Sequence, residues 1–112
     1  MTVRNGFSVL MLVLSTLLFS ANTASAKPKA SPKTYTVSIK GFEFVPEKLE
    51  VNIGDTVIWK NEDIVPHLVD AFDFRSKSMD QSESWTYQAK QKGDFPYICK
   101  FHPTMKAELI VH

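Results

Sequence analysis

Apolar side chains recur at every second position in a series of short runs after residue 33. In the first such run, Tyr35, Val37 and Ile39 alternate with polar residues. The same period returns in six further short runs, at residues 42–44, 49–53, 56–60, 83–87, 95–99 and 107–111. This alternation is typical of strands that bury one face. No window after Ala26 combines helical spacing with a helix cap, so the pattern predicts an all-β fold.

Short strands at regular spacing, without helices between them, are typical of antiparallel sandwiches and Greek-key barrels. We therefore predict a Greek-key β-sandwich, with Trp59 in its core. Gly54 can adopt positive φ in a turn over residues 52–55, and residues 92–94 predict a hairpin turn. Residues 70–82 show no sustained period and predict a long connection, which Phe74 and Met79 attach to the core.

The N-terminal 26 residues have the composition of a secretory signal peptide. Arg4 precedes an apolar run over residues 7–19, and small residues lead to Ala26. The alternative is a retained membrane anchor, but the run is shorter than the roughly 20 residues that a spanning helix needs. We predict a signal peptide at 1–26, a flexible leader at 27–33 and one domain at 34–112. The exported domain is expected in the periplasm, without stable membrane insertion.

The charge balance excludes one class of partner, and the cysteine content limits how the fold can be stabilised. The chain has 13 Lys and Arg against 12 Asp and Glu, and Arg4 is the only charged residue in the predicted signal. Such a balanced domain is not expected to bind nucleic acid. Cys99 is the only cysteine and cannot form an internal disulfide. In an oxidising compartment a metal-bound thiolate would be protected.

Cys99, His102 and Met105 form a C-x2-H-x2-M motif between two predicted strands. A thiolate, an imidazole and a thioether together favour copper, since hard ions prefer oxygen and zinc rarely takes a thioether. His67 can supply the second imidazole of a type 1 site, with Met105 as a weak axial ligand to one ion that alternates between Cu(I) and Cu(II). His67 is expected to be the more buried histidine. His102 should reach the surface between Phe101 and Pro103, which are suited to a small docking patch.

The sequence resembles the cupredoxins, and its short ligand loop is similar to that of the amicyanin branch more than to the longer loop of plastocyanins. The resemblance covers most of the domain, through the runs at residues 42–46, 51–59, 66–67 and 95–105. It implies a Greek-key β-sandwich and copper ligation by His67, Cys99, His102 and Met105. Leu68 and Lys100 depart from the family pattern, which has Asn and a small hydroxyl residue at these positions.

The resemblance also implies a function. A monomeric cupredoxin of this kind would transfer single electrons between periplasmic redox proteins, such as a c-type cytochrome or a dehydrogenase, and would not be an enzyme. Two alternatives remain open from the residues alone. A copper chaperone would use the same ligands but release its ion to a target. A Cys-His hydrolase would use Cys99 as nucleophile and a histidine as base, but it leaves Met105 without a role.

Overall fold

A computed structural model describes residues 15–20 and 30–112 of the chain. The predicted signal peptide therefore lies outside the described residues, apart from 15–20, as does the leader at 27–29. Residues 30–33 carry no regular secondary structure, and the first strand begins at Thr34. Within the described ranges, no helix is long and apolar enough to cross a membrane.

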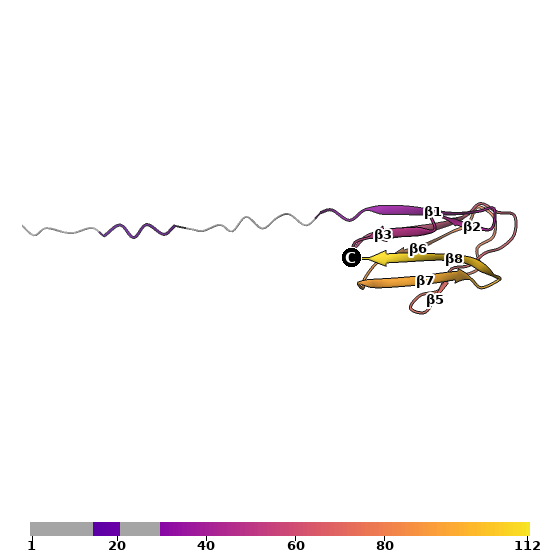
Figure 1. The fold of residues 1–112 in the computed structure, drawn as a ribbon. Coiled ribbons are helices and arrows are strands. Elements are labelled where there is room, and N and C mark those ends of the chain that lie inside the picture. The colour runs from indigo at the N-terminus through magenta and orange to yellow at the C-terminus, as the bar shows by residue number, and fades with distance from the viewer. Residues whose placement is uncertain (1–14, 21–29) are drawn as a thin grey trace, which may run out of the picture.

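Eight strands form the described fold (Figure 1). Seven of them correspond to the seven runs of alternation, and the eighth, a two-residue strand at 70–71, lies in the segment that was predicted as a long connection. One sheet has the order β2-β1-β4-β6, and the other has the order β3-β8-β7-β5. Their bounds are β1 Thr34–Lys40, β2 Glu43–Val45, β3 Lys48–Val51, β4 Thr56–Asn61, β5 Asp70–Ala71, β6 Ser84–Gln88, β7 Gly93–Cys99 and β8 His102–Val111. The all-β prediction is confirmed.

Both sheets are mixed, whereas the sequence pattern led us to expect antiparallel strands. β1 runs parallel to β4, and β3 runs parallel to β8. Because β3 crosses to the second sheet, β4 returns on the free side of β1 and runs in the same direction. The hairpin predicted at residues 92–94 is also wrong, since β6 pairs with β4 while β7 pairs with β8. That segment crosses between the sheets instead.

The strand pairing also extends further into the C-x2-H-x2-M motif than its sequence suggests. Met105 was expected to precede the last strand, but β8 begins at His102, which pairs with Cys99 across a register shift. Lys100 and Phe101 alone form the turn between β7 and β8. Cys99 therefore ends one strand, while His102 and Met105 lie on its antiparallel neighbour.

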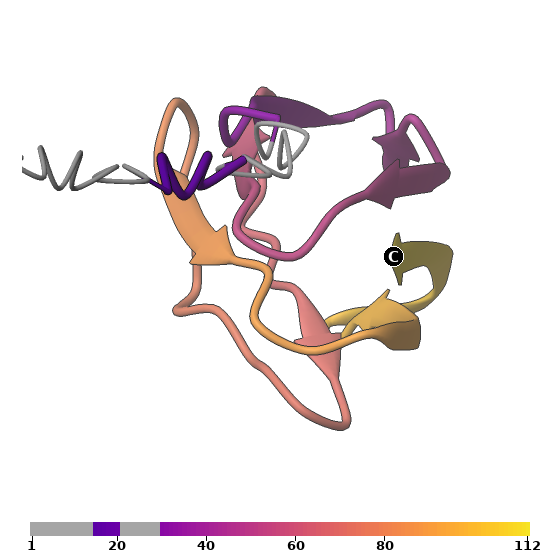
Figure 2. The same cartoon turned by 90° about the vertical axis from the view of Figure 1, so that its left-hand side faces the viewer.

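The two sheets face each other in the view along the strands (Figure 2), and the hydrophobic core is built from residues of both sheets and of the connections. Trp59 is fully buried, and Phe74 and Met79 attach the connection at 70–82 to this core, as predicted. The core side chains come from both sheets and from the connections between strands: Val37, Ile39, Phe44, Val51, Val57, Trp59, Val69, Phe74, Met79, Ala89, Phe95, Tyr97, Cys99, Met105, Ala107, Leu109 and Val111.

The two ends of the sandwich carry different features. At one end, Lys33 enters β1 beside the turn at Asn52–Asp55 and the C-terminal His112. Gly54 has a φ of 95° in this turn, which confirms the predicted left-handed conformation. β7 ends and β8 begins at the other end (Figure 1). That end brings the candidate ligands together.

Candidate metal centre

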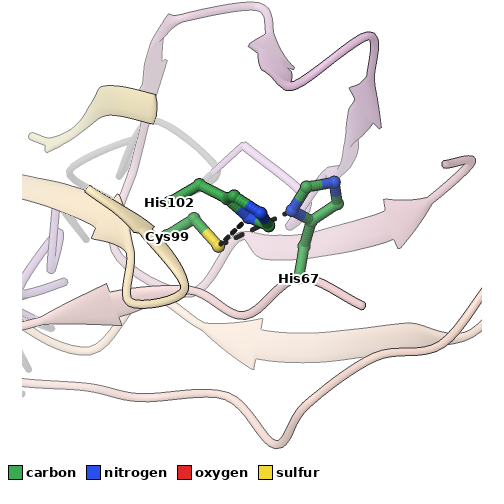
Figure 3. A group of neighbouring side chains, drawn as sticks. All are labelled: His67, Cys99 and His102. Atoms are coloured by element: carbon green, nitrogen blue, oxygen red, sulfur yellow. Dashed lines mark hydrogen bonds between the residues drawn. The ribbon is translucent and has the colours of Figure 1, made fainter. Parts of the chain in front are cut away.

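Three of the four predicted ligand side chains converge at the end of the sandwich where β7 meets β8 (Figure 3). One ligand atom from each of His67, Cys99 and His102 can be chosen so that all lie within 4.8 Å of one another. Cys99 Sγ lies 3.6 Å from His67 Nδ1 and 3.8 Å from His102 Nδ1. Both imidazoles therefore present the same ring nitrogen to the thiol.

The β7–β8 pairing explains how Cys99 and His102 reach one point. In an extended strand, two residues three positions apart are separated by about 10 Å, and their side chains point to opposite faces. Here the chain reverses after Cys99, so that His102 pairs with it from the next strand. Cys99 is fully buried, while His102 is half-buried beside Phe101, which is 49% exposed. The predicted difference between a buried His67 and a more accessible His102 is confirmed.

His67 is placed by the connection that follows β4. Its backbone N–H donates to Met79 O at 3.1 Å, and Met79 N–H donates to His67 O at 2.8 Å. This isolated antiparallel bridge fixes the backbone at the histidine. The side chain is fully buried, and its Nε2 lies 2.8 Å from Asp63 Oδ2. Because an ionised carboxylate can only accept, Nε2–H donates to Asp63, and Nδ1 faces Cys99.

Asp63 connects His67 to the turn between β1 and β2. Its Oδ1 accepts the Gly41 N–H at 2.8 Å, and its Oδ2 accepts the Phe42 N–H at 3.0 Å. Partial burial works to raise the pKa of the Asp63 carboxyl. The hydrogen bonds from Phe42, Gly41 and His67 outweigh that effect and hold the pKa below its ordinary value. The carboxylate thus orients the ring nitrogen that faces away from Cys99.

Asn61 supports the same segment from within the core. Its Nδ2 donates to Val65 O at 2.9 Å and to Met79 O at 2.8 Å, while its Oδ1 accepts the Asp63 N–H at 3.0 Å. Neither Asn61 nor Asp63 was singled out from the sequence. The four-residue separation of Asp63 and His67 was an available signal, but many such pairs do not interact.

Phe42 contacts both imidazoles, and it was also missed as a site residue. Its ring centroid lies 5.4 Å from that of His67 and 5.1 Å from that of His102, each at an interplanar angle of 88°. This edge-to-face arrangement is a favourable one for aromatic rings. Alternation had indicated only that Phe42 shares a strand face with Phe44.

Met105 lies three residues beyond His102 on β8 and is 4% exposed. It packs in the core and also lines a surface groove of about 500 Å³, together with Phe42 and Phe44. Its position on the same strand as His102 is compatible with the predicted axial role. That role stays a prediction.

The chemistry of the three convergent donors fits a copper ion. A buried thiol between two imidazole nitrogens matches the two-histidine, one-cysteine set of trigonal copper sites, and the Met105 thioether lies on the same strand as His102. Asp63 provides the outer hydrogen bond that metal-bound histidines commonly make.

Comparison with known proteins gives the same picture. A family model described as a cupredoxin-like domain matches residues 8–111. The plastocyanin of Nostoc punctiforme is 32% identical, with 82% of each chain covered. Amicyanin of Paracoccus versutus is 26% identical over 82 residues; the match spans 67% of this chain but only 62% of that protein.

Solved structures with similar folds include both small and large proteins. An amicyanin variant in its Cu(I) form has a TM-score of 0.67 at 24% identity, with 70% of this chain and 82% of that chain covered. The copper-containing nitrite reductase of Thermus scotoductus has a TM-score of 0.69 at 28% identity. The match covers 74% of this chain but only 23% of the reductase, so it extends over a part of that protein.

Proposed function

The chain belongs to the cupredoxin-like family, and we propose that it is an exported carrier of single electrons between periplasmic redox proteins. Members of this family bind one copper ion, and the amicyanins and plastocyanins among them are electron-transfer proteins. We assign His67, Cys99, His102 and Met105 as the ligands. The observation that supports this most strongly is the convergence of two Nδ1 atoms on the buried Cys99 thiol.

A copper ion held by these side chains would supply one-electron exchange between Cu(I) and Cu(II). The protein's part is to keep the ligands in place through each exchange. Cys99 and His102 are held by strand pairing, and His67 is held by its bridge to Met79 and its bond to Asp63. Ligands fixed in this way need little rearrangement when the charge on the metal changes.

His102 is the proposed point of electron entry and exit because it is the accessible ligand. Exposed apolar side chains on three segments lie near the ligands in sequence or space: Phe42, Ile64 and Phe101. Their exposed fractions are 49%, 84% and 49%. Exposed apolar side chains beside an accessible ligand, such as Phe42 and Phe101 next to His102, are suited to brief docking of another redox protein, for example a c-type cytochrome or a dehydrogenase.

The structure contains one feature that a Cys-His hydrolase would need, an orienting acid, but it lacks a second, accessibility of the nucleophile Cys99. Asp63, His67 and Cys99 form an acid-imidazole-thiol series, which supplies the orienting acid that the sequence did not reveal. However, Cys99 is fully buried and has the second imidazole, His102, beside its sulfur. A nucleophile must meet its substrate, so this arrangement favours metal binding over acyl transfer.

The test is the visible spectrum of the purified protein after addition of Cu(II). We expect an intense thiolate-copper band that ascorbate bleaches and an oxidant restores. Cys99→Ser should lose the band, and His102→Gln should weaken or shift it. His112→Gln is the matched control, because His112 is exposed at the opposite end of the sandwich. A folded, copper-loaded protein without this band would contradict the proposal.

A competition experiment separates an electron carrier from a copper chaperone. A chaperone must release Cu(I) readily, whereas an electron carrier retains it through repeated redox cycles. We expect Cu(I) to stay bound while a chelator of graded concentration competes for it and the protein is cycled between oxidation states. Loss of the ion within a few cycles would favour copper delivery.

A further inference from the structure

The turn between β1 and β2 holds a bulky residue in an unusual backbone conformation beside the candidate ligands. Gly41 and Phe42 have φ values of 60° and 59°. Glycine adopts this left-handed region freely, but a phenylalanine there is an outlier that the surrounding structure must stabilise. Such outliers concentrate at functional sites.

Asp63 supplies that stabilisation. Its carboxylate accepts the backbone N–H groups of both turn residues and also binds His67 Nε2. One carboxylate with two acceptor oxygens therefore serves three donors. The conformation of the turn and the orientation of the buried imidazole are consequently joined through a single side chain.

The turn places the Phe42 ring against both imidazoles, although 49% of the residue is exposed. His67 and His102 come from different segments, and Phe42 is an aromatic neighbour common to them in the described structure. The ring also lines the groove of about 500 Å³ that contains Met105. Removal of the ring would extend that groove toward the imidazoles.

We propose that Phe42 is a positioning residue that caps the copper centre, and that Asp63 fixes the position of the Phe42 turn relative to His67. The inference rests on the proposed function. Phe42 restrains the accessible His102 against the buried His67 and excludes water and small anions from the metal. Asp63 couples the β1–β2 turn to the His67 ring, because a shift of the turn would also strain the hydrogen bond between Asp63 and His67.

Phe42→Gly tests the cap without imposing strain on the fold, since glycine is the residue best suited to a φ near 59°. The probe is azide, titrated into the Cu(II)-loaded protein and followed in the visible spectrum. We expect Phe42→Gly to bind azide at least tenfold more tightly than the wild type. Phe42→Tyr retains the ring and should restore the wild-type response.

Phe72→Gly is the matched control, because Phe72 is fully exposed on the turn after β5 and is not in ring contact with either histidine. It should leave azide binding unchanged. Equal azide affinity in Phe42→Gly and the wild type would overturn the cap. If the wild type itself lacked the thiolate-copper band, the proposed function would fail instead, so the two failures are distinguishable.

Asp63→Asn tests the coupling, since an amide offers one acceptor oxygen in place of two. We expect the azide affinity of Asp63→Asn to lie between the affinities of the wild type and of Phe42→Gly. In the copper-free protein, imidazole ¹H–¹⁵N spectra should show a changed environment at the His67 ring. Unchanged azide binding together with unchanged His67 ring signals would refute the role of Asp63.

Discussion

Ionisation of the Tyr97 hydroxyl is expected to destabilise the folded state. Tyr97 lies on β7 two residues before Cys99, and its side chain is buried. Its hydroxyl accepts the Trp59 Nε1–H at 3.2 Å, which joins β7 to β4 across the sandwich. Burial raises the pKa of Tyr97 to about 12, although the hydrogen bond from Trp59 works in the opposite direction.

This shift predicts a loss of stability at high pH. Between pH 10 and 12 the unfolded chain releases the Tyr97 proton while the folded chain retains it, so stability falls as pH rises. A displacement of this size corresponds to about 2 to 3 kcal/mol across the interval. Tyr97→Phe should lack that part of the decline, which urea unfolding at fixed copper concentration can measure.

The same substitution should cost stability at neutral pH, because Trp59 Nε1–H would lose its buried acceptor, at about 1 to 3 kcal/mol. Tyr87→Phe provides the comparison. Burial and the charge of Asp73 also raise the pKa of Tyr87, but its side chain is only partly buried. It should alter the alkaline decline less than Tyr97→Phe does. An unchanged decline in Tyr97→Phe would contradict the assignment.

Among the elements, the start of β1 and the turn before β4 depend on one carboxylate. Asp55 is buried, and its two oxygens accept the Lys33 N–H and the Asn52 N–H, each at 2.8 Å. The bond from Lys33 fixes the entry of the chain into β1, and the bond from Asn52 closes the turn. The Lys33 and Asn52 hydrogen bonds, in that order, outweigh burial and lower the pKa of Asp55 below its ordinary 3.8.

A lowered pKa gives stability that is present above pH 3.8 and is lost as the pH falls through the folded value. Asp55→Asn can accept only one of the two N–H groups with its single oxygen and should be less stable at pH 7. Thermal unfolding should show the difference from the wild type narrowing below about pH 4. A difference that stayed constant down to pH 2 would contradict the prediction.

The strands could be predicted from sequence because alternation is a local property. The run from Tyr35 to Ile39 carries the same information in any β-fold, and so does the burial of Trp59. Pairing is not local. Nothing in the alternation distinguishes β6 followed by a hairpin from β6 followed by a crossing to the other sheet. The parallel pairs and the position of β7 therefore had to come from the structure.

In the candidate site, too, some residues could be recognised from the sequence and others only from the structure. Cys99, His102 and Met105 were proposed as ligands because their chemistry is unusual at that spacing, and His67 was proposed because the site needed a second imidazole; three of the four converge. Phe42 and Asp63 have ordinary alternatives, as a core aromatic and a solvated carboxylate. Their roles depend on where the β1–β2 turn lies relative to His67, which strand pairing and long-range hydrogen bonds determine.

At the scale of the whole molecule, the candidate copper site lies at one end of the sandwich. The contacts that hold the start of the first strand lie at the opposite end, the anchoring end. Lys33, the Asn52–Asp55 turn and His112 meet at one end, while the three convergent ligands meet at the other. A partner that docks for electron exchange should therefore use the ligand end alone. Substitutions at the anchoring end should leave that exchange unaffected.

Phe101 and Ile53 provide a matched pair for testing this polarity, since each is an apolar residue with 49% exposure. Phe101 precedes His102, whereas Ile53 lies in the turn at the opposite end. Phe101→Ser should slow the second-order reduction of the protein by a c-type cytochrome about tenfold, equivalent to about 1.4 kcal/mol of docking energy. Ile53→Ser should not change the rate. Stopped-flow kinetics would measure both, and the midpoint potentials would separate weaker docking from altered driving force. Equal rates in the two variants, at equal potentials, would mean that docking does not use the surface beside His102.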